Sequence, residues 1–235
     1  AGLDDAGKMI AFDNHFITMG KNGEIISGAG LSPKRYPAGL VPHFRLRQSI
    51  IETNVPTGPW RAPGASAYCW AYQSFYDELA LATGRDPLDF RLDLLSQSYG
   101  KPPLDLARAR GTLKLAAEKA GWGRDPGANR GLGIAFSYGH LGYVSHVAEV
   151  SAKGSRVTVE KVVSAVDVGP ILNLSGARNQ VEGCVIDGLS TAQLEITFEN
   201  GATRQDNFQN YRLLKIRQAP EIDVHFIQSD NSPTG

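Results

Sequence analysis

The stretch "YVSHVAEVSAKGSRVTVEKVVSAVDVG", residues 143–169, indicates the fold class of the chain. β-Branched residues are dense on both sides of Lys153-Gly154-Ser155, and a glycine-containing turn between two such runs predicts a β-hairpin. Three helical patterns precede this hairpin as a block, and one follows it. Because strands and helices come in blocks without strict alternation, the sequence favours an α+β fold, with mixed or antiparallel sheets and packed helices, over a doubly wound sheet.

Alternation of apolar and polar residues in the second strand of the hairpin predicts one apolar face. The residues expected to share that face are Val157, Val159, Val163 and Ala165. A Gly-Lys-Asn-Gly turn predicts another hairpin near the N-terminus, and the Gly/Pro-rich residues 29–43 are expected to be irregular. The remaining extended segments are expected at residues 8–18, 23–28, 43–55, 130–139 and 221–228.

Four apolar patterns with spacings of three and four residues predict amphipathic helices. Asp86 and Asn173 are the expected N-caps of the second and fourth helices, and Gly121 is the expected end of the third. The aromatic face of the first helix, which includes Tyr68 and Tyr72, is expected in the core. The four helices are predicted at residues 65–83, 87–98, 104–122 and 174–193.

A glycine-rich stretch at residues 123–131 is the expected boundary between two subdomains. Residues 1–125 would form a first α+β subdomain, which holds a Gly-Pro-Trp-Arg-Ala-Pro-Gly loop and three helices. Residues 126–235 would form a second α+β subdomain, with the hairpin strands and a helix that contains Gln-Val-Glu-Gly.

Charge and composition argue against several classes of function. The 235 residues include 24 basic and 24 acidic side chains, a balance that favours neither nucleic acid nor an anionic membrane as a partner. No apolar run reaches the roughly 18 residues that a membrane span needs. The histidines show no metal-ligand spacing, so no metal site formed by side chains is expected. Cys69 and Cys184 lie in apolar helical patterns, which predicts buried thiols and no disulfide.

The loop before the first helix, residues 54–64, holds an arginine in a stiff frame. Pro59 and Pro63 fix φ on either side of Arg61, and the free N–H groups of the helix that begins at Ala65 follow directly. A guanidinium beside a helix N-terminus can bind an anion. The alternative is a rigid connection in which Arg61 hydrogen-bonds a carbonyl of the core. The residues alone support both interpretations equally.

The fourth helix contains three glycines, each of which costs about 1 kcal/mol relative to alanine. Gly176, Gln180, Gly183 and Asp187 lie on a single stripe of this helix. The stripe would form a shallow groove with one amide inside it. A flat ligand contacted by Gln180 could fill the groove, although close packing of another helix is the interpretation that the residues alone favour.

Two long blocks of the chain carry a family resemblance. The first is "TGPWRAPGASAYCWAYQSFYDELALATGRDPLDFRLDLL", residues 57–95, and the second comprises residues 157–201 and 207–235. In the same order, they resemble the molybdopterin-binding subunit of the xanthine dehydrogenase/aldehyde oxidase family. They are most similar to the branch of isoquinoline 1-oxidoreductase β-subunits and related bacterial aldehyde dehydrogenases. The resemblance extends over nearly the whole chain from about residue 3.

The resemblance implies which residues bind the cofactor. Arg61 in "GPWRAPG" matches the arginine of the family's cofactor loop, and Gln180 in "QVEG" matches a glutamine that contacts the pterin. Gly64, with the helix N-terminus, would add backbone donors, and Gly183 would allow close approach. The implied site therefore consists of Arg61, Gly64, Gln180 and Gly183, with no metal-ligating side chain.

The resemblance also implies a reaction for the parent protein. Its members hydroxylate aldehydes or N-heterocycles with oxygen derived from water, using molybdopterin, which is expected in its cytosine dinucleotide form. Electrons would pass through a small iron–sulfur subunit to an external acceptor. Both the periplasm and the cytoplasm of a bacterium fit this description.

Two elements of the family pattern are absent from these 235 residues: a Gly-Gly-Gly-Phe-Gly loop and the Gly-x-Gly-Glu motif with the catalytic glutamate. In this branch that motif follows directly after "SPTG", beyond Gly235. The chain is therefore expected to be an internal fragment that holds no catalytic residue, binds no cofactor tightly, turns over no substrate alone and self-associates. The alternatives are a non-catalytic scaffold or interaction module with the same fold, and a protein that binds an unrelated anion at Arg61.

Overall fold

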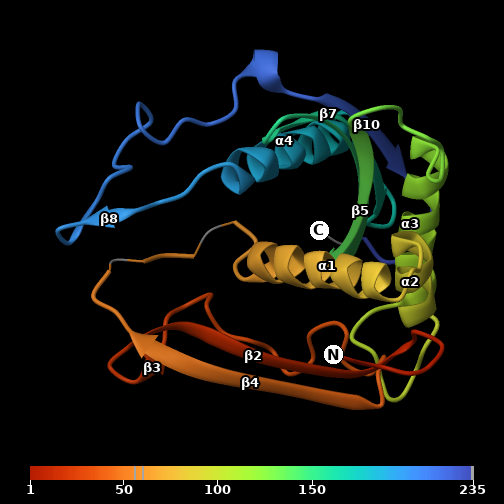
Figure 1. Cartoon of the computed structure of the whole chain (residues 1–235), viewed down its shortest axis with the longest axis horizontal. Helices are drawn as coiled ribbons and strands as arrows, with labels where there is room; N and C mark the ends of the chain where they lie inside the picture. Colours follow the sequence, from red (N-terminus) through yellow and green to blue (C-terminus); the bar gives the residue numbers. More distant parts are fainter. Residues whose placement is uncertain (56, 60, 234–235) are drawn as a thin grey trace.

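The computed structural model describes residues 1–55, 57–59 and 61–233, and its first half is built on one sheet (Figure 1). The long strand β2 (Met9–Lys21) pairs antiparallel with β1 (Gly2–Leu3) and β3 (Glu24–Ile25), which confirms the predicted N-terminal hairpin. On its other side, β2 pairs in parallel with β4 (His43–Glu52).

The second half is built on a four-stranded sheet with the order β10-β7-β6-β5. Its strands are β5 (Arg130–Gly139), β6 (Gly142–Lys153), β7 (Arg156–Asp167) and β10 (Glu221–Phe226). The β6–β7 hairpin turns at Gly154, and β10 joins β7 in parallel after the helix α4. Both sheets therefore contain parallel and antiparallel pairs, and the predicted α+β class is confirmed. A short ribbon of β8 (Phe198–Glu199) and β9 (Ala202–Thr203) lies apart from them.

The four predicted helices are present, and their ends follow the capping residues. The Asp86 carboxylate accepts from the N–H groups of Leu88 and Asp89, Asn173 accepts from the N–H of Gly176, and Gly121 ends α3 in the left-handed conformation. The second helix ends earlier than the predicted residue 98. The helices are α1 (Ala65–Ala82), α2 (Pro87–Leu94), α3 (Leu106–Ala120) and α4 (Leu174–Ala192), with a 3₁₀ turn η1 (Ile216–Gln218).

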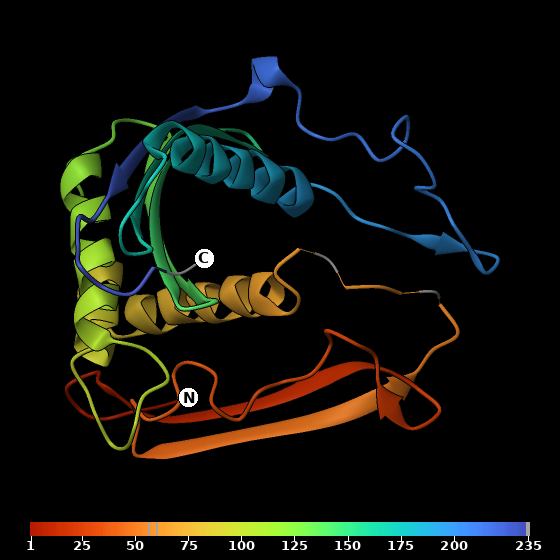
Figure 2. The same cartoon turned by 180° about the vertical axis from the view of Figure 1, so that it is seen from behind.

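Helix α1 lies between the two sheets (Figure 2). Its Tyr72 hydroxyl accepts from Asn14 Nδ2 of β2 at 3.0 Å, and its Gln73 Oε1 accepts from the Phe136 N–H of β5 at 3.1 Å. Tyr68 and Tyr72 are buried, as predicted. Helix α3 packs against β5, β6 and β7 on one face of the second sheet, where Thr112 Oγ1 of α3 lies 2.9 Å from Ser145 Oγ of β6 (Figures 1 and 2). Helix α2 packs against α1 and α3.

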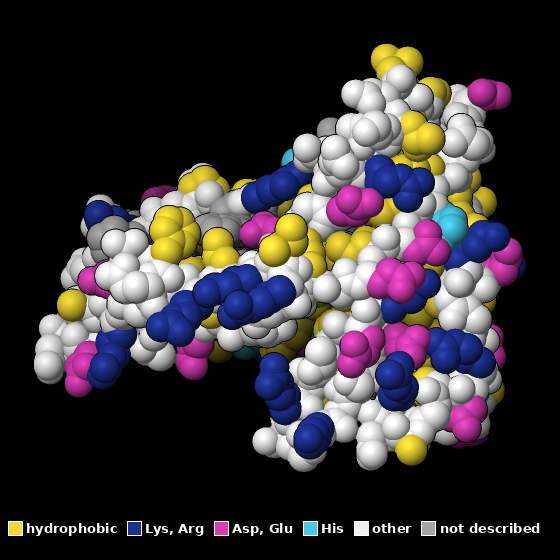
Figure 3. Space-filling model, turned by 90° about the horizontal axis from the view of Figure 1, so that it is seen from above, with side chains coloured by type: hydrophobic (Ala, Val, Ile, Leu, Met, Phe, Trp, Pro, Cys, Tyr) yellow, Lys and Arg dark blue, Asp and Glu magenta, His cyan; other side chains and the backbone are white. Residues whose placement is uncertain are grey.

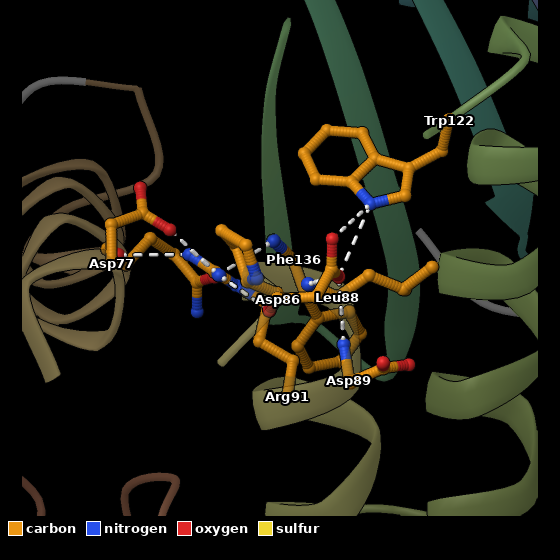
Figure 4. A network of polar contacts seen from close by, with 9 residues as sticks. Asp77, Asp86, Leu88, Asp89, Arg91, Trp122 and Phe136 are labelled. Atoms are coloured by element: carbon orange, nitrogen blue, oxygen red, sulfur yellow. Dashed lines mark hydrogen bonds and ion pairs between the residues drawn. The ribbon is translucent and has the colours of Figure 1, made fainter. Parts of the chain in front are cut away.

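A buried arginine joins α2 to α1 (Figure 4). Arg91 is fully buried, and its Nε and Nη2 donate to the side-chain and backbone oxygens of Gln73 at 2.7 and 2.9 Å. Its Nη1 donates to Pro87 O at 2.9 Å and pairs with Asp77 Oδ1 at 2.8 Å. Because Gln73 Oε1 also accepts from Phe136 N, this network fixes α1, α2 and β5 together.

The predicted shared face of β7 is wrong because the strand contains a bulge. Val159 pairs with Val150, whereas Lys161 pairs with Glu149, so Glu160 is an extra residue. Since side chains alternate with period two, one extra residue moves those that follow to the opposite face. Val157 and Val159 consequently do not share a face with Val163 and Ala165, and Val157 is exposed.

The prediction of two buried cysteines is wrong for one of them. Cys69 is partly buried on α1, but Cys184 is exposed on α4. Among the described residues, only Val185 and Ser190 of α4 are buried, because this helix packs mainly along β10. The Cys184 side of the helix therefore has no packing partner within the described chain.

The hydrophobic core includes residues from both halves of the chain. Met9 and Phe12 of β2 belong to the same cluster as Ile134 of β5 and Ala165 of β7, and buried residues of α1 and α3 also belong to it. Helix α3, from the first half, packs against β5, β6 and β7 of the second. The division into residues 1–125 and 126–235 stays a prediction.

Candidate functional site

Arg61 and Gln180 meet although they lie far apart in the sequence. The loop before α1 rises toward α4 (Figure 1), and Arg61 Nη2 donates to Gln180 Oε1 at 3.2 Å across a separation of 119 residues. Both side chains are exposed. Among the described residues, no carboxylate lies within ion-pair distance of Arg61. The pair therefore presents an unneutralised guanidinium and an amide to the space between the two helices.

The backbone before α1 holds Arg61 in place by an unusual conformation. Ala62 has a φ of 56° and Gly64 a φ of 69°, both in the left-handed region, and Ala65 N–H donates to Ala62 O at 3.0 Å. A Cβ on Gly64 would lie 3.1 Å from the Tyr68 ring, so the turn conformation and this close packing both favour glycine. Within the described residues, no side chain caps the N-terminus of α1. Trp60, which precedes Arg61 in this loop, lies outside the described residues.

The glycine stripe of α4 is not filled by another helix in the described chain. A Cβ added to Gly183 would meet no atom of these residues within 4 Å, whereas one on Gly176 would meet the capping side chain of Asn173 at 3.0 Å. Gly183 and Gln180 are exposed on the same stripe. The space beside Gly183 is open, as the ligand interpretation requires.

These donors and acceptors match the chemistry of a phosphate-bearing heterocycle. The guanidinium is a planar, permanently charged donor that suits a phosphate, and the glutamine amide both donates and accepts, as the edge of a pterin requires. The described residues contain no cluster of three His, Cys, Asp or Glu side chains that could hold a metal ion. None of the helices in the described ranges is long and apolar enough to cross a bilayer.

The structure adds a cavity of about 230 Å³ that the sequence analysis missed. It lies against the first turns of α1, one turn beyond Arg61, and extends to the end of β5. We call it the Arg35 pocket, and its principal lining residues are Arg35, Tyr68, Cys69, Tyr72, Ser137 and Tyr138. A signal was present in the sequence, because Pro33 and Pro37 frame Arg35 much as Pro59 and Pro63 frame Arg61.

Burial keeps the acidic groups of this pocket protonated. Burial raises the pKa of Tyr68 to about 12, and it also raises the pKa of Tyr72 and of the Cys69 thiol. The thiol is partly buried and donates to Phe136 O at 3.6 Å. A protonated thiol is a weak nucleophile, so the chemistry of the pocket is binding and not covalent attack.

Comparison with known proteins identifies the family. The model of the molybdopterin cofactor-binding domain matches residues 97–220, which is more than half of the chain. The chain belongs to this molybdopterin-binding family. The matched range contains the hairpin β6–β7, all of α4 and Gln180.

Relatives by sequence are components of oxidoreductases. The chain is 32% identical over 201 residues to the beta subunit of isoquinoline 1-oxidoreductase from Brevundimonas diminuta, covering 83% of this chain and 25% of that protein. It is 28% identical over 211 residues to a nicotinate dehydrogenase subunit from Pseudomonas putida, covering 81% of this chain and 17% of that protein. The chain thus spans about a quarter or less of these relatives.

Solved structures of molybdenum hydroxylases share the fold. Quinoline 2-oxidoreductase from Pseudomonas putida 86 superposes with a TM-score of 0.78 at 12% identity, covering 99% of this chain and 55% of that one. Aldehyde oxidoreductase from Desulfovibrio desulfuricans gives a TM-score of 0.73 at 13% identity, covering 97% and 42%. The family resemblance and the fold expected from it are confirmed. The roles of Arg61, Gly64, Gln180 and Gly183 stay predictions.

Proposed function

We propose that this chain is a cofactor-binding part of a molybdenum hydroxylase large subunit, and that Arg61 and Gln180 together contact the molybdopterin. The observation that carries the proposal is their 3.2 Å hydrogen bond, which joins the α1 loop to α4 in a protein of the molybdopterin-binding family. Both side chains are exposed, so a ligand can reach them.

Each residue has a distinct role in this proposal. Arg61 neutralises the phosphate, with Gly64 and the N-terminus of α1 supplying backbone donors beside it. Gln180 donates to and accepts from the pterin edge, and Gly183 leaves the surface flat enough for close approach. The cofactor, which bacterial proteins of this kind are expected to carry in its cytosine dinucleotide form, supplies the redox chemistry when bound.

The substrates proposed for the whole enzyme are aldehydes or N-heterocycles. The names of the relatives include isoquinoline and nicotinate, which are N-heterocycles, and a structural neighbour is an aldehyde oxidoreductase. A small iron–sulfur subunit and an external acceptor complete the proposed electron path. Because these 235 residues contain neither Gly-x-Gly-Glu nor Gly-Gly-Gly-Phe-Gly, we propose that they do not turn over substrate by themselves.

The test measures pterin and molybdenum retained by the assembled enzyme that contains this chain. We expect Arg61→Gln and Gln180→Ala to lower retention at least about tenfold, since each removes a direct contact. The matched control is Arg156→Gln, which removes the same charge from an exposed position at the start of β7. Wild-type retention in Arg61→Gln would reject the assigned role. Aldehyde-dependent dye reduction by the 235 residues alone would reject their proposed inactivity, and stoichiometric molybdenum in them would reject the expectation that they bind no cofactor tightly.

An extended arm after α4 supports a proposal about association. Large apolar side chains on this arm are exposed, including Phe198, Phe208 and Ile216, the last with 95% of its surface accessible. Figure 3 shows hydrophobic side chains scattered among Lys and Arg side chains on the part of the surface that includes the arm. We propose that the 235 residues self-associate through the exposed large apolar side chains of this arm, because association would remove them from water. Light scattering that shows a monomer at high concentration would contradict this, and Phe208→Ser should weaken the association.

A further inference from the structure

The Arg35 pocket contains a cation that the described residues leave without a polar partner. Arg35 Nε is buried and has no hydrogen-bond partner, and within the described chain no carboxylate forms an ion pair with this guanidinium. The guanidinium carbon of Arg35 lies 4.2 Å from the centroid of the Tyr68 ring. This cation–π contact orients the guanidinium plane but gives its N–H groups no hydrogen-bond acceptor. A half-buried arginine whose Nε is buried and unpaired favours an anionic guest.

The walls of the pocket determine the shape and charge of that guest. Tyr68 and Tyr72 on α1 and Tyr138 at the end of β5 provide aromatic surfaces, and Ser137 adds a hydroxyl. None of the described residues that line the pocket is acidic, and Lys34 at its rim adds a second positive charge. The volume of about 230 Å³ lies below the roughly 300–1,000 Å³ of pockets that take drug-sized ligands, so it suits a compound with one ring.

We propose that the Arg35 pocket binds a small planar carboxylate, a single aromatic ring that carries one acidic group, and that Arg35 selects for the charge. The carboxylate receives two parallel hydrogen bonds from the guanidinium, while the ring lies against the tyrosines. Tyrosine hydroxyls are neutral at pH 7 even without a shift, and burial raises the pKa of the Cys69 thiol, so none of these groups repels an anion. That such a compound is also the substrate of the whole enzyme rests on the proposed function. In that proposal the cofactor binds at Arg61, which lies four residues before Ala65 of this pocket.

The binding of benzoate and of its neutral isostere benzamide to the purified protein, without molybdopterin, tests the proposal by calorimetry. We expect benzoate to bind at least about tenfold more tightly than benzamide, since only the carboxylate forms the charged pair. Arg35→Gln should abolish this preference, and Arg35→Lys should retain part of it because the charge remains without the planar fork. The control Arg156→Gln should bind benzoate as the wild type does.

Equal binding of the two probes, no binding of benzoate to the wild type, or unchanged selectivity in Arg35→Gln would each overturn the proposal. A thermal unfolding curve of Arg35→Gln that matches the wild type shows that lost binding is not lost folding. This test is independent of the test of the cofactor site. If the wild type prefers benzoate but Arg61→Gln still retains pterin, only the proposed role of Arg61 is rejected. If Arg61→Gln loses pterin but the wild type shows no preference for benzoate, only the anion selectivity of the Arg35 pocket is rejected.

Discussion

The hydrogen bond between Arg61 and Gln180 joins two exposed side chains that approach from separate elements. Such a bond adds little to folding, because water competes for both groups and two long side chains lose rotamer freedom. The unusual φ values of Ala62 and Gly64 nevertheless hold the arginine close to α4. Ala62 is not a glycine, so its positive φ is strained, and such strain beside a weak surface contact is typical of a binding site rather than of a structural support.

Substitution of this pair should therefore leave stability almost unchanged. We expect Arg61→Ala, Gln180→Ala and the double variant each to change the free energy of unfolding by less than about 1 kcal/mol. Denaturant unfolding of the purified protein measures this directly. A loss of more than about 2 kcal/mol in Arg61→Ala would support the alternative interpretation, in which this arginine stabilises the core.

Replacement of the buried Arg91 should have the opposite effect. Arg91→Leu would remove the guanidinium that donates to two oxygens of the buried Gln73 and pairs with the half-exposed Asp77 carboxylate, and we expect a loss of about 2–4 kcal/mol because buried acceptors are left unsatisfied. Denaturant unfolding is again the measurement. Arg156→Leu, at an exposed position, is the matched control and should cost less than about 0.5 kcal/mol. A similar small cost in Arg91→Leu would contradict the structural role assigned to this network (Figure 4).

The buried pair of Arg108 and Asp167 should make the protein sensitive to acid. Arg108 Nη2 and Nε donate to the two carboxylate oxygens at 2.7 and 2.9 Å. Burial alone would raise the pKa of Asp167, but the hydrogen bonds from Arg108 and from Gly169 N–H outweigh it and hold the pKa below 3.8. A lowered folded pKa contributes stability above the unfolded value, and this stability is lost as the pH falls through the folded value.

Unfolding free energies measured below pH 4 test that linkage. The wild type should lose stability there, whereas Asp167→Asn, less stable at pH 7, should show a shallower fall because its side chain does not titrate. If both proteins fall with the same slope below pH 4, Asp167 is not the group responsible. Asp89→Asn, on the surface of α2, is a control that should keep the wild-type slope.

The sequence predicts elements better than it predicts their contacts. Local signals are strong where a cap or turn has its own chemistry, as at Asp86, Asn173 and Gly154, and these predictions are confirmed. The early end of α2 and the bulge at Glu160 depend on packing and pairing partners that no local pattern specifies. The exposure of Cys184 has the same origin, because an apolar pattern does not say whether a partner covers it.

For the candidate site too, the sequence predicts individual residues but not the contacts between them. Stiff loops and helix glycines mark Arg61 and Gln180 as unusual in the sequence, and the family resemblance relates them to one cofactor. Their meeting at 3.2 Å depends on the tertiary fold, which no spacing in the sequence encodes. For Arg35, the flanking prolines are visible in the sequence, but the burial of its Nε in a pocket between α1 and β5 follows only from the tertiary fold.

His146 should introduce a second, separate acid transition. Its Nδ1 lies 2.8 Å from Ser164 Oγ in the middle of the second sheet, and burial lowers the pKa of this histidine to about 4. The folded state therefore favours the neutral ring, while the unfolded chain takes up a proton near pH 6.5. The contribution to stability is complete above pH 6.5 and is lost as the pH falls toward 4, reaching about 3 kcal/mol. His146→Gln, which keeps a hydrogen-bonding group beside Ser164, should flatten the stability profile between pH 6.5 and 4, whereas the exposed His43→Gln should not. Unfolding free energies across this window decide it, because a profile that stays steep in His146→Gln would assign the transition to another group.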